Sequence, residues 1–165
     1  MSALGEAAFA DLYRLHSRAL WSYVYRVTGN AADADDIVQE AYLRMLSTDL
    51  PPLAGDEPKR YLFRIAGNLM ADRWRRSSRE HGGLDGVADR AAPPVSPPDH
   101  DVTRTFTELK PRERALLWLA YVEGEDHEGI AQALRVARGS VKVLLSRARA
   151  RLRDRLAARG VISRT

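Results

Sequence analysis

The sequence contains no cysteine among its 165 residues. This absence excludes a disulfide scaffold, a thiolate nucleophile and a thiolate zinc site. No stretch approaches the roughly 20 apolar residues of a membrane-spanning helix, so we expect no insertion into a membrane. From Met1 to Phe9 no basic segment precedes an apolar one, and no secretory signal is visible. No segment alternates polar and apolar residues as a half-buried strand does, which predicts an all-α protein.

The net charge is only +4, but it is distributed unevenly along the chain. Residues 1–76 carry 10 basic and 10 acidic side chains, residues 77–103 carry 2 and 5, and residues 104–165 carry 14 and 7. A neutral block, an acidic middle and a basic end therefore follow one another. A basic segment favours an anionic partner, or a solvated basic surface.

The middle segment also differs in composition, because four prolines and three glycines replace almost all large apolar residues between Ser77 and Thr103. Such a segment predicts a flexible, partly extended linker. We therefore expect two small helical domains, 1–76 and 104–165, joined by the linker 77–103. A long surface loop within one domain is the alternative, but loops of this length are uncommon in compact domains.

Apolar residues at helical spacing predict three helices in the first block. The expected ranges are Phe9 to Val27, Asp33 to Leu46 and Lys59 to Arg76. Gly29 and Asn30 separate the first two helices, and a proline-containing loop from Asp49 to Pro58 separates the last two.

The second of these helices carries acidic residues opposite its apolar stripe. Asp33, Asp36 and Glu40 share this face. Acidic residues near a helix N-terminus are stabilised by the helix dipole, so a solvated face and a docking surface for a basic partner helix both fit the pattern. No histidine joins these carboxylates, and no pocket is recognisable from the sequence. We therefore expect no metal site, no cofactor and no acid–base catalysis.

The third helix combines basic and aromatic residues. Arg60, Arg64, Asn68 and Arg75 lie within about one quadrant of its surface. Arginines bind phosphates, and aromatic rings such as that of Trp74 stack on unpaired bases. Alternatively, Phe63, Met70 and Trp74 complete the packing against the first helix while the arginines complement the helix dipole. The pattern of this helix favours neither interpretation.

A further helix is expected from Leu109 to Glu123, followed by a helix-turn-helix from His127 to Ser146. Its turn is Arg135-Val136-Ala137, and Ala131 is small enough for the second helix to approach. Arg135 stands where many such motifs carry glycine. If the backbone there needs a positive φ, arginine costs about 1 kcal/mol relative to glycine. The second helix is expected to continue to about Ala158. Its outward face carries a basic cluster with a serine at the edge: Arg138, Lys142, Ser146, Arg149 and Arg153. This combination favours duplex DNA binding.

Three segments, in this order and spacing, resemble bacterial RNA polymerase sigma factors of the sigma-70 family, extracytoplasmic-function type. They are DADDIVQEAYLRML from Asp33, RYLFRIAGNLMADRWRR from Arg60, and LKPRERALLWLAYVEGEDHEGIAQALRVARGSVKVLLSRARARL from Leu109. The resemblance implies a dissociable initiation subunit that recruits core polymerase to specific promoters and has no enzymatic activity. The alternative is a stand-alone helix-turn-helix regulator.

The resemblance also implies a role for each matching residue. The segment that docks on the coiled coil of the largest polymerase subunit corresponds to Asp33, Asp36, Gln39, Glu40 and Leu43. The segment that opens and reads the −10 promoter element corresponds to Arg60, Phe63, Arg64, Asn68, Asp72, Trp74, Arg75 and Arg76. The helix that reads the duplex −35 element corresponds to Arg138, Ser140, Lys142, Ser146, Arg149 and Arg153.

The implied partners are core RNA polymerase, through its coiled coil and its flap, promoter DNA that is single-stranded at −10, and an anti-sigma factor. The implied location is the cytoplasm. Departures from the family pattern occur at Gly67, where the family usually has arginine or lysine, at Val143 and Leu144, and at Asp126-His127. The departures at Val143 and Leu144 and at Asp126-His127 concern the expected −35 recognition. The departure at Gly67 implies a missing phosphate contact.

Overall fold

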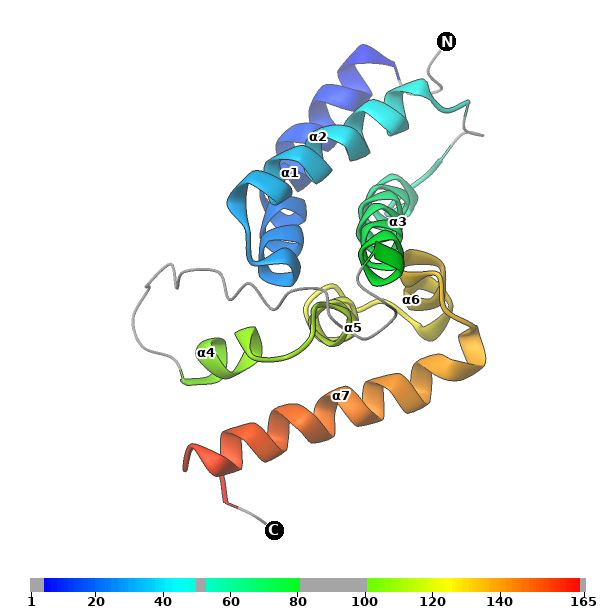
Figure 1. The fold of residues 1–165 in the computed structure, drawn as a ribbon. Helices are drawn as coiled ribbons and strands as arrows, with labels where there is room; N and C mark the ends of the chain where they lie inside the picture. The colour runs from blue at the N-terminus through cyan, green and yellow to red at the C-terminus, as the bar shows by residue number, and fades with distance from the viewer. Residues whose placement is uncertain (1–4, 50–52, 81–100, 164–165) are drawn as a thin grey trace.

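The computed structural model describes residues 5–49, 53–80 and 101–163, and all regular structure in these ranges is helical. The helices are α1 (Glu6–Thr28), α2 (Ala31–Ser47), α3 (Glu57–Glu80), α4 (Asp101–Thr107), α5 (Pro111–Tyr121), α6 (His127–Leu134) and α7 (Arg138–Ala158). The expected all-α class is confirmed. α1 and α2 lie at one end of the molecule, α7 lies at the other, and α3, α5 and α6 lie between them (Figure 1).

The boundary between α1 and α2 lies where the sequence predicts it. Gly29 adopts the left-handed conformation at φ 68°, and its N–H donates to the carbonyl of Tyr25 at 2.7 Å. Asn30 then caps α2, its side-chain oxygen accepting from the N–H of Asp33 at 3.1 Å. A left-handed glycine ends one helix and an asparagine begins the next, so α1 and α2 form a tight antiparallel pair.

The first three helices pack around side chains that are fully removed from solvent. Tyr23, Ile37 and Met45 are among them, and Leu62 and Met70 contribute from α3. α3 is longer than expected: it begins at Glu57 and continues to Glu80, into the first part of the expected linker. Residues 81–100 of that linker lie outside the described residues.

The C-terminal part contains one helix that the sequence reasoning missed. α4 has seven residues, too few to show a helical repeat, and it begins within the segment expected to be linker. α5 begins at Pro111, because proline has no N–H to satisfy and fits the first helical position. The three residues from Arg135 to Ala137 separate α6 from α7, which confirms the helix-turn-helix.

The two halves of the chain are packed against each other. α3 contacts α6 and α1 contacts α5, and Figure 1 shows α3 directly beside α6. Buried side chains from both halves form one continuous cluster, in which Tyr23 and Met70 join Leu116, Ile130 and Leu134. The sequence predicts two tethered domains; it does not predict that their apolar cores meet.

Candidate nucleic-acid and protein-binding surfaces

The acidic residues of α2 lie on its outer surface. Asp36, Gln39 and Leu43 are exposed, with 51% of Leu43 accessible. Glu40 forms an ion pair with Arg44 at 3.0 Å along the same helix. The face therefore combines carboxylates with an apolar residue that no neighbouring helix covers in the described structure. That combination suits contact with a basic helix.

Asp33, the first of these acidic residues, is turned toward α3 instead. Its carboxylate lies 3.5 Å from the guanidinium of Arg73. It also lies in the first turn of α2, where the helix dipole stabilises a negative charge. Asp33 thus has a structural role within the helical pair, besides any part in docking.

The four arginines of α3 that are expected to contact the −10 element are all exposed: Arg60, Arg64, Arg75 and Arg76. The two aromatic residues expected beside these arginines are less accessible than the arginines are. Phe63 is only 3% exposed and stacks on Tyr23, with 5.5 Å between ring centroids. Trp74 is half-buried, at the edge of the core. For Phe63 the structure favours the packing interpretation, because its ring is enclosed between helices; a base-stacking role for it stays a prediction.

Two other residues expected to read DNA, Asn68 and Asp72, face α6. In the amide orientation that satisfies its neighbours, the Asn68 nitrogen donates to the carbonyl of Gln132 at 2.8 Å and to that of Ala133 at 2.9 Å. Asp72 pairs with Arg75 on its own helix and with Arg135 of the helix-turn-helix, the latter at 3.3 Å. Both side chains are therefore engaged within the molecule.

Gly67 lies where α3 crosses α6. A Cβ atom added to Gly67 would lie 2.6 Å from the carbonyl oxygen of Ala133 and 3.1 Å from its Cβ. Real Cβ atoms do not approach a backbone oxygen so closely, so the crossing requires glycine. This gives a packing reason for a position where the family usually has a long basic residue. The sequence contains no signal for this need for glycine, because Ala133 is more than sixty positions away from Gly67.

Acidic residues of the C-terminal half face the basic end of α3. Lys59 pairs with Glu123 at 3.1 Å, and Arg60 lies 4.0 Å from Glu125. A groove between α3 and α6 is lined by Arg60 and Arg64 and also by Glu125, Asp126 and Glu128. Burial raises the pKa of Glu125 above its ordinary value of 4.5, although Arg60 acts in the opposite direction. Arg60 and Arg64, which are expected to contact DNA, therefore share this groove with carboxylates of the C-terminal half.

Asp126 is one of the residues that depart from the family pattern, and it caps α6. Its carboxylate accepts from the N–H of Gly129 at 2.7 Å, as serine would do at this position. The other member of the pair, His127, is exposed.

All six residues expected to read the −35 element are exposed on α7: Arg138, Ser140, Lys142, Ser146, Arg149 and Arg153. Two of them are held by neighbours. Arg138 lies 3.4 Å from Glu128, and Arg149 donates to the hydroxyl of Tyr121 at 2.9 Å. Val143, which is 48% exposed, lies among them, whereas Leu144 is half-buried. The N-terminal part of α7 therefore presents a basic surface with one apolar residue.

Arg135 has a left-handed backbone conformation, which is costly for a residue other than glycine. Its φ is 54°, the one positive φ among non-glycine residues of the described chain. Its guanidinium reaches Asp72 of α3. The side chain therefore makes an ion pair that glycine could not make, at the cost of local backbone strain.

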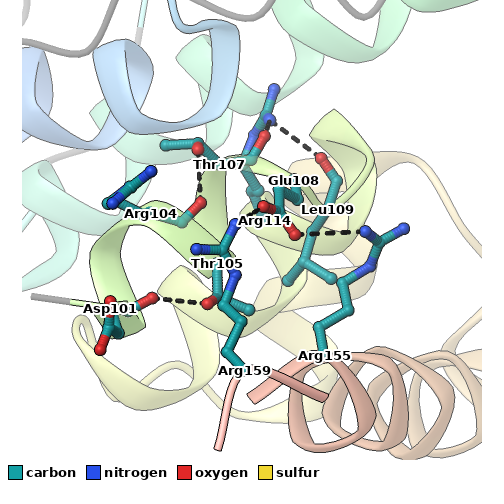
Figure 2. A network of polar contacts seen from close by, with 9 residues as sticks. All are labelled: Asp101, Arg104, Thr105, Thr107, Glu108, Leu109, Arg114, Arg155 and Arg159. Atoms are coloured by element: carbon teal, nitrogen blue, oxygen red, sulfur yellow. Dashed lines mark hydrogen bonds and ion pairs between the residues drawn. The ribbon is translucent and has the colours of Figure 1, made fainter. Parts of the chain in front are cut away.

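A buried arginine joins α5 to α1. Arg114 is 6% exposed, and it donates to the carbonyl of Val27 from Nε at 3.1 Å and from Nη2 at 2.6 Å. Its Nη1 donates to the carbonyls of Thr107 and Leu109 at 2.7 and 2.9 Å. Figure 2 shows this guanidinium at the turn after α4, where Glu108 pairs with Arg155 and Arg159 of the α7 end. Sequence reasoning did not single out Arg114.

Among the described residues, no group of three or more histidine, cysteine, aspartate or glutamate side chains is arranged to hold a metal ion. In the same part of the chain, no helix is both long enough and apolar enough to cross a bilayer.

An acidic helix face, an arginine-bearing helix and a helix-turn-helix define an all-helical DNA-binding protein. Two family profiles match the chain: Sigma-70 region 2 over residues 12–80, and Sigma-70 region 4 over residues 100–152. The chain therefore belongs to the sigma-70 family, in its extracytoplasmic-function group, and directs RNA polymerase to promoters. A stand-alone helix-turn-helix regulator is not favoured, because the first match covers the N-terminal helices.

Similar proteins cover nearly the whole chain. The extracytoplasmic-function sigma factor SigL of Mycobacterium tuberculosis is 34% identical over 97% of this chain and 96% of its own length. SigW of Bacillus subtilis is 27% identical over 90% of this chain and 89% of its own length. The solved structure of RpoE of Bartonella quintana, in complex with the anti-sigma factor NepR, has a TM-score of 0.66. It is 24% identical and covers 94% of this chain and 98% of its own, which shows the fold.

Proposed function

We propose that this sigma factor acts by binding alone, through three surfaces that bring core polymerase, the −10 element and the −35 element together. The observation that carries the proposal is the separation of charge in the structure: an exposed acidic face on α2 and an exposed basic face on α7. Opposite charges on separate surfaces suit partners of opposite charge.

The acidic face of α2 is the proposed polymerase-docking surface. Asp36, Gln39 and Leu43 are exposed there, with Glu40 beside them and Asp33 at the end toward α3. A basic coiled coil would meet carboxylates at the rim and Leu43 within the contact. The apolar residue would contribute affinity, and the carboxylates would contribute orientation and association rate.

The proposed −10 surface is the arginine-bearing side of α3. Arginines bind the phosphates of the unpaired strand, and the half-buried Trp74 supplies an aromatic ring for a base. The proposed residues are Arg60, Phe63, Arg64, Asn68, Asp72, Trp74, Arg75 and Arg76. Of these, Phe63, Asn68 and Asp72 are engaged within the molecule and would need a rearrangement to reach DNA.

The proposed −35 surface is the N-terminal half of α7 with its later arginines. The first turns of a recognition helix enter the major groove, and arginines farther along hold phosphates. Arg138, Ser140 and Lys142 lie in those first turns, and Ser146, Arg149 and Arg153 follow at helical spacing. Val143 would contact an apolar feature of the groove, such as a thymine methyl group.

The proposal also covers the domain boundaries, a further partner and the location of the protein. The domain boundaries are 1–76 and 104–165, with the linker 77–103 between them. An anti-sigma factor is a proposed partner, as in the solved relative from Bartonella quintana, whose title names one. We also propose a cytoplasmic location and no catalytic activity.

In vitro transcription tests the proposal as a whole. Core polymerase with this protein, on a genomic promoter library, is expected to give transcripts whose start sites share −10 and −35 sequences. The docking surface is tested by the double variant Asp36→Arg with Glu40→Arg, which should no longer co-purify with core polymerase. Its control is Glu6→Arg with Asp11→Arg, which reverses two exposed charges on α1 instead. Normal co-purification of the α2 variant would disprove the docking assignment.

A further inference from the structure

A cavity of about 380 Å³ lies where the C-terminal half of α3 meets α5, α6 and α7. α6 contacts each of the other three helices (Figure 1). The apolar lining of the cavity comes from all four: Ala71 and Trp74, Leu116, Leu134, and Leu144 and Ala148. Pockets for small molecules have volumes of about 300–1,000 Å³ and mostly apolar walls, so this cavity has the size and lining of a ligand site.

Positive charges surround this apolar lining. Six residues that line the cavity are cationic: Arg75, Lys110, Arg112, Arg135, Arg147 and Arg151. They come from α3, from the start of α5, from the turn after α6 and from α7, so they approach the cavity from different directions. Cations around a concave surface with apolar walls focus a positive potential there, because water screens them less than on an open surface.

Two carboxylates neutralise part of this charge. Asp72 pairs with Arg75 and with Arg135, and Glu113 lies 2.5 Å from Arg151. These pairs hold three of the cations in place around the cavity. Six cations and two carboxylates leave a net charge of +4, so the cavity favours an anionic ligand.

Two of the remaining cations, Arg112 and Arg147, can turn toward a ligand. Both side chains are exposed, and neither forms an ion pair with a described residue. Because successive residues of a helix are about 100° apart, Arg147 lies on a different side of α7 from Arg149 of the proposed −35 surface. The proposed contacts with DNA therefore do not account for these two arginines.

Trp74 supplies an aromatic wall. Its side chain lines the cavity and is half-buried at the edge of the core. Any nucleobase can stack on such a ring, because every base has a π face. Arginine guanidinium groups bind phosphate through two parallel hydrogen bonds. A ligand that carries both a flat base and phosphate groups would therefore use the apolar and the cationic parts of the cavity together.

We propose that this cavity binds a nucleoside polyphosphate. The base lies against Trp74 and the apolar residues, and the phosphates lie toward Arg112 and Arg147. A nucleoside alone would leave the cations without a partner, and an inorganic phosphate would leave the aromatic and apolar walls uncovered. The proposal goes beyond promoter recognition, since it concerns a free nucleotide and the cavity it would enter.

Isothermal titration calorimetry of the full chain with GTP, guanosine and inorganic triphosphate, each without magnesium, tests the proposal. GTP should bind at one site. Its affinity should exceed that of inorganic triphosphate by about tenfold, because the base adds its stacking on the indole. Guanosine should bind at least about tenfold more weakly than GTP, because it lacks the phosphates.

The phosphate contacts are tested by the double variant Arg112→Gln with Arg147→Gln. It should weaken GTP and inorganic triphosphate to the same extent, by about 100-fold, since each arginine contributes about tenfold. The matched control is Arg18→Gln with Arg104→Gln. It removes the same charge from exposed positions that do not line the cavity, and it should bind both ligands as the parent does.

The base contact is tested by Trp74→Leu. This variant should weaken GTP by about tenfold and leave the affinity for inorganic triphosphate unchanged. Trp74→Phe keeps an aromatic ring and should recover most of the affinity for GTP. Trp21→Leu is the control, because its indole does not line the cavity. If circular dichroism shows that Trp74→Leu is unfolded, Ser78→Glu replaces it: this change adds a carboxylate to the lining and should weaken both ligands.

Three results would overturn the proposal. The first is that GTP does not bind. The second is equal affinity for GTP and inorganic triphosphate, which would show an anion site only. The third is an equal loss in the cavity double variant and in its control, which would show attraction to the overall charge. None of these measurements uses DNA or polymerase, so a failure here is distinct from a failure of the proposed promoter role.

Discussion

The guanidinium of Arg114 donates two hydrogen bonds to a single acceptor, the carbonyl oxygen of Val27, eighty-seven positions earlier in the chain. Val27 is in the last turn of α1, so the buried positive charge also lies at the negative end of that helix dipole. Arg114 thus satisfies a helix end in one half of the protein from a helix in the other half.

Replacing this side chain is expected to cost stability. Arg114→Met keeps the length of the side chain but leaves the carbonyls of Val27, Thr107 and Leu109 without this donor. We expect a loss of about 3 kcal/mol in the free energy of unfolding, measured by urea denaturation. Arg112→Met, at an exposed neighbouring position, is the control and should change it by less than about 0.5 kcal/mol. Equal effects of both variants would contradict the tethering role.

Replacing Tyr23 is expected to raise the free energy of unfolding, which is the opposite of the effect expected for Arg114. Its side chain is fully buried, burial raises its pKa well above the ordinary value, and its hydroxyl has no hydrogen-bond partner among the described residues. Tyr23→Phe removes a buried polar group that gains nothing, and we expect the free energy of unfolding to rise by about 1 kcal/mol. Tyr25→Phe, at a half-buried position, should leave it unchanged. A destabilised Tyr23→Phe variant would show that the hydroxyl has a partner.

Stability should also depend on pH through His16. Burial, followed by the positive charge of Lys59, lowers the pKa of this imidazole from 6.5, while Asp56 and Glu123 act against the shift. A lowered pKa means that the folded protein binds the proton less readily than the unfolded chain does. The contribution of neutral His16 is therefore present above pH 6.5 and is lost as the pH falls through the lowered value.

The pH dependence is measured by denaturation across this range in the parent and in His16→Gln. The parent should lose more stability on acidification than the variant, whose side chain does not titrate. His127→Gln, which makes the same substitution at an exposed position, is the control and should behave as the parent does. Parallel curves for the parent and His16→Gln would argue against the predicted shift.

The salt dependence of DNA binding tests the basic face of α7. Lys142→Ala with Arg149→Ala should reduce the slope of log affinity against log salt concentration by about two, because each phosphate contact contributes about one. The measurement uses the duplex −35 region of a promoter identified by transcription. Arg155→Ala is the control, since Arg155 pairs with Glu108 at the other end of α7. An unchanged slope in the double variant would disprove the phosphate contacts.

The local features of the fold could be predicted because each depends on residues close in sequence. Gly29 and Asn30 end one helix and begin the next, and the apolar repeat of α2 identifies its buried side. The exposed positions of Asp36 and Lys142 follow from the same repeat. α4 was missed because seven residues give too little of a repeat to detect.

The candidate sites could be predicted only in part. The spacing of α3 places Phe63 beside the arginines but does not decide whether its ring faces a base or Tyr23. The need for glycine at position 67 depends on Ala133, and the acceptor of Arg114 depends on where α1 ends in space. These contacts join residues that are far apart in sequence, so no local pattern predicts them.

The sequence by itself determined the all-α class, the three segments that resemble the family, the helix-turn-helix and the acidic and basic faces, since periodicity and charge are local properties. Only the tertiary structure decided that α6 lies on α3, that the two apolar cores meet, and that Arg135 pairs with Asp72. The physical reason is that each half buries the apolar stripes of its own helices, which local spacing identifies. The contact between the halves depends instead on the shape and charge of surfaces that form only in three dimensions.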